Sequence, residues 1–105
     1  MMDSKKCCVV MTTTDNKDTA ILIAKTLLEG KLAACIQMDD IQSCFCYEGK
    51  YKQIKEIRLS IKASSEKYDV IEESIKFNHN YRLPQIIKLD ITSGLPEYLA
   101  WVNGY

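Results

Sequence analysis

The chain has few of the residues that build catalytic motifs and no excess charge of either sign. Its 105 residues include one histidine, one tryptophan, two prolines and four glycines. The glycines form no phosphate-cradling loop, and no G-x-S-x-G nucleophile motif is present. The 14 basic residues balance 14 acidic ones, so no net field favours a phosphate backbone or an anionic membrane. We therefore expect a protein that is no enzyme and binds neither nucleic acid nor membranes.

Long apolar runs are absent near the N-terminus. The run Cys7 to Met11, which follows Lys5-Lys6, is too short for the core of a signal peptide or for a transmembrane span. Residues 1–105 are the right length for one domain with a core of its own. The pattern predicts a single-domain cytoplasmic protein.

The five cysteines are an odd number, and none belongs to a C-x-x-C pair. Free thiols are therefore expected. Cys44 and Cys46 are two residues apart in a strand-like stretch, which would point both thiols to one face of a sheet. There they either meet a soft metal or pack as small hydrophobic groups, and packing is the more common role of a buried free cysteine.

Hydrophobic periodicity predicts four strands and two long helices. A buried strand is expected from Cys7 to Met11, followed by a helix from about Asn16 to Glu29 that is capped by Asp15 and stopped by Gly30. A hairpin should follow: its first arm is Ala33 to Met38 and Ile41 to Tyr47, it turns at Glu48-Gly49, and it returns through Ile57 to Ala63. A second helix, capped by Ser64 or Ser65, should end near Asn78, and a last strand should run from Gln85 to Ile91. The second helix should bury Tyr68, Ile71 and Ile75, with Val70 and Phe77 widening that face.

A short helix should close the chain, with Pro96 in its first turn and Leu99 and Trp101 as its apolar anchors. The resulting order, β-α-β-β-α-β plus one terminal helix, is typical of an α+β, ferredoxin-like domain. Such a domain covers one sheet face with its helices. The first strand is apolar on both faces and the last strand nearly so. Apolar surface therefore remains uncovered, and we expect identical subunits to bury it.

The only histidine, His79, stands in the segment His79 to Gln85, where the second helix gives way to the last strand. A single histidine at a helix end is commonly a cap or a hydrogen-bonded loop residue, yet its imidazole is also a common metal ligand. The topology predicts that His79 lies near Met11 to Thr14 and near Tyr47-Glu48, with Cys35 at the opposite edge. A metal there would need Met11, Glu48 or a neighbouring subunit as a further ligand, and thioether with imidazole suits copper(I).

Several segments in the same order resemble the CutA divalent-cation tolerance family. They are Lys31 to Cys35, Ser43 to Lys50 with its Glu-Gly-Lys ending, His79-x-Tyr81-x-x-Pro84, and Gly94 to Trp101. The resemblance implies a ferredoxin-like subunit in a homotrimer, similar in architecture to the P-II signalling proteins. It also implies a role in divalent metal tolerance, with copper or another divalent cation bound by the histidine of the H-x-Y motif and a first-strand residue.

The departures from the family pattern fall at this metal site. The first-strand position, a cysteine in the family, is Met11 here, so the expected metal residues are His79 and Met11. Asn80 replaces the usual proline, and Gln85 replaces a common carboxylate. The expected function is that of a non-enzymatic trimer that binds a metal ion or small ligand near the H-x-Y loop. The alternative is a P-II-like signalling or scaffolding module that binds a metabolite or partner protein at clefts between subunits.

Overall fold

The computed structural model describes residues 6–104. Its elements are β1 (Cys7–Thr14), α1 (Lys17–Glu29), β2 (Cys35–Tyr47), β3 (Lys50–Ser64), a 3-10 turn η1 (Ser65–Lys67), α2 (Tyr68–Asn78), β4 (Ile86–Ile91) and α3 (Pro96–Asn103). The four strands form one sheet in the order β2-β3-β1-β4, and every neighbouring pair is antiparallel. The predicted α+β order of helices and strands is confirmed.

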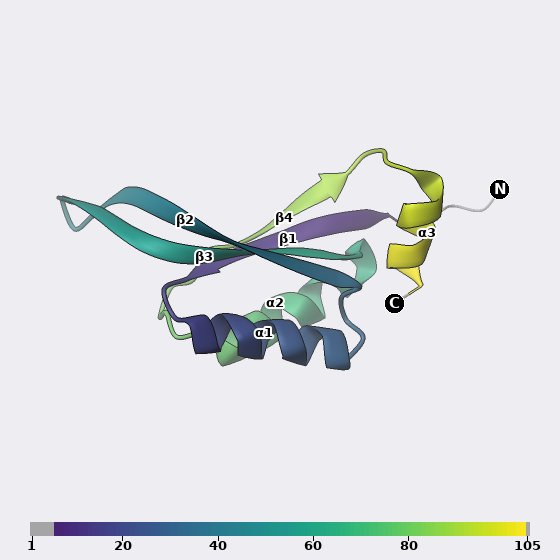
Figure 1. The fold of residues 1–105 in the computed structure, drawn as a ribbon, viewed down its shortest axis with the longest axis horizontal. Helices are drawn as coiled ribbons and strands as arrows, with labels where there is room; N and C mark the ends of the chain where they lie inside the picture. The colour runs from purple at the N-terminus through teal and green to yellow at the C-terminus, as the bar shows by residue number, and fades with distance from the viewer. Residues whose placement is uncertain (1–5, 105) are drawn as a thin grey trace.

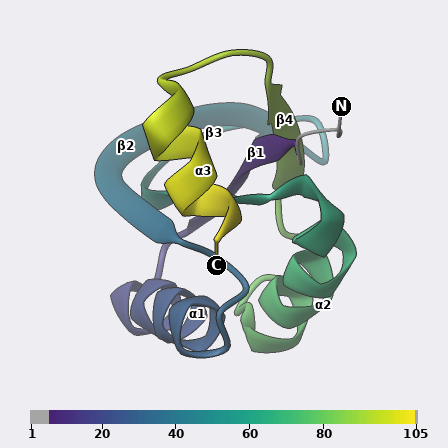
Figure 2. The same ribbon diagram turned by 90° about the vertical axis from the view of Figure 1, so that its right-hand side faces the viewer.

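Helices α1 and α2 lie side by side on one face of the sheet (Figures 1 and 2). Their apolar stripes meet the inward-facing residues of β1 and β3, which alternate along each strand. The fully buried aliphatic side chains of this core are Val10, Ile23, Leu27, Leu59, Ile61, Ile71 and Ile75. The core therefore occupies a single layer between the helices and the sheet.

The other sheet face, which we call the open face, carries an apolar strip. Val9 and Met11 of β1 pair with Leu89 and Ile87 of β4, and cross-strand partners share a face. Leu89 is 50% exposed. Helix α3 lies at one end of the sheet (Figure 1). The Cys7 thiol there approaches the backbone oxygen of Leu99. The predicted uncovered apolar surface is thus present along β1 and β4.

Strands β2 and β3 continue far beyond the end of β1 (Figure 1). The pairing of β1 with β3 ends at Thr14 and Ile57, whereas β2 and β3 remain paired as far as Tyr47 and Lys50. We call this two-stranded extension, residues 41–56, the hairpin arm. At about 3.3 Å per residue its seven-residue strands reach roughly 23 Å past β1.

The arm turns at the predicted dipeptide. Glu48 and Gly49 have φ angles of 52° and 78°, both in the left-handed region. A two-residue loop with two positive φ angles matches the right-handed twist of the flanking strands, and glycine adopts it without strain. The turn therefore fixes the register that pairs Tyr47 with Lys50.

Some local predictions are wrong in informative ways. Asn16, and not Asp15, caps α1: its backbone is extended and its side chain accepts from Thr19 N at 2.9 Å. Strand β2 is continuous through Asp39 and Asp40, because Asp39 forms a 2.8 Å ion pair with Arg58 on β3 instead of breaking the strand.

The helix faces also differ from expectation. Ile71 and Ile75 are buried as predicted, but Val70 is 56% and Phe77 88% exposed, since both lie on the side of α2 that points away from α1 and the sheet. In α3 the fully buried residue is Val102, while Trp101 is exposed. No helix among residues 6–104 combines the length and apolar character needed to cross a membrane.

The cysteines divide into two groups. All five are free; Cys7 and Cys8 are buried, and Cys35 is partly exposed. Burial raises the pKa of the Cys7 and Cys8 thiols. Cys44 and Cys46 are exposed, so within one chain they are not the buried, packed thiols that were expected: both lie on the hairpin arm, which no helix covers.

Candidate functional site

His79 ends α2 and places its ring against the end of β1. Its Nε2 lies 2.9 Å from the backbone oxygen of Thr13, and the Tyr81 backbone N–H donates to Nδ1 at 3.0 Å. Because Nδ1 accepts a hydrogen bond, Nε2 carries the ring proton and donates to Thr13. Both ring nitrogens of the neutral imidazole are therefore engaged within the chain.

The surroundings of His79 favour this neutral form. Burial lowers the pKa of His79 from 6.5, and the Thr13 carbonyl, Glu56 and Asp15 oppose that shift without cancelling it. A neutral imidazole at neutral pH is the form that binds metals. Here, however, a metal at either nitrogen must first displace a hydrogen bond.

The next loop residue, Asn80, ties the loop to the connection between β1 and α1. Thr14 Oγ1 donates to Asn80 Oδ1 at 2.5 Å, and Asn80 Nδ2 donates to Asp15 at 2.9 Å. Asn16 N in turn donates to Thr14 Oγ1 at 3.2 Å. Asn80 thus makes two side-chain hydrogen bonds that the proline expected here from the resemblance could not make.

A nearly buried carboxylate, Glu56, joins the loop to the hairpin arm. Glu56 is 8% exposed, and its two oxygens accept hydrogen bonds of 2.6 Å from the hydroxyls of Tyr81 and Ser43. Burial and the bond to Glu56 strongly raise the pKa of Tyr81, so the phenol stays protonated and acts as a donor. Glu56 is the functional candidate that the sequence analysis missed. Alternation of side chains along the strands would place Glu56 on the same sheet face as Ser43, but only once the register between β2 and β3 is known.

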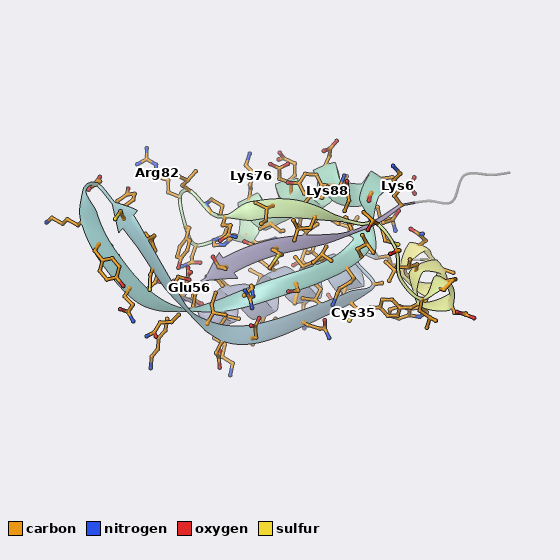
Figure 3. The ribbon with its side chains drawn as sticks, turned by 90° about the horizontal axis from the view of Figure 1, so that it is seen from above. Lys6, Cys35, Glu56, Lys76, Arg82 and Lys88 are labelled. Atoms are coloured by element: carbon orange, nitrogen blue, oxygen red, sulfur yellow. The ribbon has the colours of Figure 1, made fainter. Side chains whose placement is uncertain are left out.

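These groups surround a hollow of about 420 Å³ between the loop and the base of the arm. The hollow is lined by Thr13, Ser43, Cys44, Phe45, Glu56, Tyr81, Leu83 and Gln85. Thr13 Oγ1 lies 3.5 Å from Gln85 Oε1. Figure 3 shows Glu56 beside the end of β1 and Cys35 near the opposite end of the sheet. The hollow offers hydroxyl, amide and carboxylate groups to a ligand.

The predicted metal residues occupy different surroundings. Met11 is on the open face between Ser60 and Ile87, and it does not line the hollow beside His79. The expected proximity of His79 to Tyr47-Glu48 is wrong, because the arm carries Glu48 roughly 23 Å past the end of β1. Its place near the loop is taken by Glu56.

Within residues 6–104, no three or more His, Cys, Asp or Glu side chains are grouped so that they can hold a metal ion. Both His79 nitrogens are engaged as well. A metal bound there would need donors from a neighbouring chain, and the pairing of His79 with Met11 stays a prediction.

Comparison with known proteins identifies the family. The family profile described as CutA1 divalent ion tolerance protein matches residues 8–104. The chain belongs to this family. A divalent-cation tolerance protein CutA from Archaeoglobus fulgidus is 38% identical over 91 residues, which cover 87% of this chain and 89% of that protein. The family resemblance seen in the sequence is therefore confirmed.

Solved CutA structures share the fold. The structure described as the periplasmic divalent cation tolerance protein CutA from Archaeoglobus fulgidus has a TM-score of 0.88 at 36% identity, covering 91% of this chain and 94% of that one. CutA1 from Oryza sativa has a TM-score of 0.89 at 34% identity, covering 94% and 92%. The CutA fold thus extends over nearly the whole chain.

Proposed function

We propose that this protein is a non-enzymatic, homotrimeric CutA of ferredoxin-like fold that serves divalent-cation tolerance and binds a ligand beside the H-x-Y loop. The observation that carries the proposal is the hollow at the end of β1. Loop and arm bring Tyr81, Glu56 and Gln85 together there, although they are up to 29 positions apart in the sequence.

The open face supports the homotrimer. Ile87 and Leu89 expose an apolar strip next to Val9 and Met11, and such strips are normally buried in an interface. The hairpin arm lacks a partner strand within residues 6–104. In a trimer, arms and open faces of neighbouring subunits can cover one another, which would bring donors of a second chain close to the hollow.

The ligand class follows from the groups present. A metal ion such as copper fits only if a neighbouring subunit adds donors and one His79 hydrogen bond is released. A small polar ligand requires neither added donors nor the loss of a His79 hydrogen bond. The volume of the hollow also falls in the usual range for ligand sites, about 300–1,000 Å³. Both remain within the proposal, and the small ligand needs the smaller rearrangement.

Calorimetric titration separates these ligand classes. Copper(I) and copper(II) are titrated separately into the assembled wild-type protein and into the His79→Ala and Glu56→Gln variants. Heat of binding that is lost in His79→Ala supports a metal at the loop. Equal binding by wild type and His79→Ala removes His79 from any copper site.

The P-II-like alternative rests on the polar character of the same hollow. A metabolite bound there should remain bound through gentle purification. Native mass spectrometry of the trimer would then show it as added mass. The Glu56→Gln variant should lose that mass if the carboxylate contacts the ligand. A bare trimer from cells grown under several conditions would count against the signalling role.

We also propose a cytoplasmic location, because all five cysteines are free and free thiols are typical of reducing compartments. One relative is described as periplasmic and a rice relative as chloroplastic, so location differs within the family. Cell fractionation with antibody detection tests the proposal. Recovery of the protein outside the cytoplasm would refute it.

A further inference from the structure

Two exposed thiols share one face of the hairpin arm. Cys44 and Cys46 are alternate residues of β2, so their side chains leave the same side of the strand while Phe45 leaves the other. Both thiols are exposed, and neither is in a disulfide. They form the only pair of exposed cysteines so close in sequence within residues 6–104.

Their neighbours on β3 complete a small polar surface. Cys44 pairs with Gln53 and Cys46 with Tyr51, and the Tyr51 hydroxyl lies 3.3 Å from Gln53 Oε1. The Tyr51 hydroxyl also contacts the Cys44 thiol, and this hydrogen bond raises the pKa of Tyr51. The first thiol is therefore a hydrogen-bonded polar group and not a packed hydrophobe.

The spacing of the two thiols suits a bridging ion better than a disulfide. Alternate residues of a strand hold their Cβ atoms about 6.7 Å apart, whereas a disulfide brings them to about 3.8 Å. A metal with two bonds of about 2.3 Å to sulfur allows the sulfurs to stand about 4.6 Å apart. Two thiols that lean toward each other can reach this separation without bending the strand.

We infer that Cys44 and Cys46 chelate one copper(I) ion per chain as a dithiolate, at a site separate from His79. Thiolates are soft ligands that select copper(I), and residues 41–56 of the arm include no imidazole that would compete for the ion. Lys50, Lys52 and Lys55 add positive charge to the same arm, which offsets the charge of a dithiolate.

The binding step changes no oxidation state. Each thiol loses its proton to solvent, two sulfur–copper bonds form, and the ion enters and remains as copper(I). Affinity should therefore fall as the pH is lowered. Cys44 also lines one edge of the hollow described above, whereas Cys46 does not. The copper(I) site requires neither His79 nor Glu56, so variants of those two residues separate it from ligand binding at the H-x-Y loop.

Anaerobic competition with a coloured copper(I) chelator, bathocuproine disulfonate, tests the site on fully reduced, assembled protein. Wild type should withdraw one equivalent of copper(I) per chain, and Cys44→Ser/Cys46→Ser should bind it at least about 100-fold more weakly, because two soft ligands are gone. Cys35→Ser, a matched change elsewhere on β2, should compete like wild type. Undiminished binding by the double variant, or equal loss in Cys35→Ser, would overturn the inference.

Alkylation of the wild-type protein gives a second test that needs no variant. Iodoacetamide should modify Cys44 and Cys46 in the metal-free assembly, and stoichiometric copper(I) should protect both, as read by peptide mass spectrometry. Thiols that stay unmodified without copper would show that neighbouring subunits cover them. Thiols that remain reactive with copper bound would show that the ion sits elsewhere, and either result refutes the site.

Discussion

The hydroxyl of Tyr81 donates a 2.6 Å hydrogen bond to Oε2 of Glu56, and this contact links the loop after α2 to the base of the hairpin arm. The two residues are 25 positions apart in the sequence. Ser43 donates to the other carboxylate oxygen from the opposite strand of the arm. Three segments thus converge on one nearly buried carboxylate, which positions the arm relative to the hollow.

Removal of the Tyr81 hydroxyl should weaken this junction. Tyr81→Phe leaves the aromatic ring in place but deprives the buried carboxylate of one donor, so we expect a loss of about 1–3 kcal/mol in the free energy of unfolding. Denaturation in urea at a fixed protein concentration measures it. Tyr47→Phe, which removes an exposed hydroxyl near the arm tip, is the matched control, and an equal effect of both changes would contradict the account.

Stability should depend on the protonation of His79. The pKa of His79 in the folded protein lies below its unfolded value of 6.5, because burial disfavours the charged ring. The unfolded chain therefore binds more protons around that pH, and the contribution of His79 to stability is present above pH 6.5 and declines as the pH falls through that value.

Since His79 is the only histidine, one variant isolates the effect. The stability of metal-free wild type relative to His79→Gln should decrease from about pH 7.5 to about pH 5.5, as followed by urea denaturation at each pH. A difference that stays constant over this range would show that His79 is not shifted. A stability advantage of wild type that grows toward low pH would show that folding raises the pKa of His79 instead of lowering it.

The N-terminus of α1 should depend on Asn16. Its side chain satisfies the Thr19 N–H at 2.9 Å, so Asn16→Ala should lower the free energy of unfolding by about 1 kcal/mol. Asn16→Asp supplies an equivalent acceptor and should retain most of the stability. Thermal unfolding followed by circular dichroism compares them, and equal destabilisation by both would argue against the cap.

The sequence was most informative where local patterns decide the structure. The strand and helix order, the turn at Glu48-Gly49 and the stop at Gly30 follow from periodicity and turn chemistry. The position of Glu56 could not be predicted, because it depends on the register of β2 against β3 and on how far the arm outruns β1. Alternation of polar and apolar residues predicts which face of the sheet each side chain lies on, but it does not predict where each strand ends.

Two other predictions are wrong for a related reason. Asp39 and Asp40 looked like a strand break, yet the ion pair between Asp39 and Arg58 keeps β2 continuous. Phe77 looked like part of the helix core and is exposed, because the apolar stripe of α2 is satisfied by Ile71 and Ile75. In the first case a contact between strands outweighed the local preference, and in the second the helix buries a narrower face than the apolar pattern predicts.

A charge on the open face should block assembly. Leu89 is 50% exposed on the apolar strip, so Leu89→Glu places a carboxylate where a neighbouring subunit is expected, and burial of an unpaired charge is costly. We expect monomers at micromolar concentration by size-exclusion chromatography with light scattering. Val70→Glu changes a similarly exposed apolar residue on α2, outside the open face, and should leave the assembly intact. Dissociation by both changes would show a general loss of structure.

Sedimentation of the unmodified protein tests the central claim, that copies of the chain cover the open face. At micromolar concentration we expect one species with the mass of three chains of 12.0 kDa each. A species with the mass of a single chain, stable across the concentration range, would contradict the claim and would leave the apolar strip of β1 and β4 without an explanation.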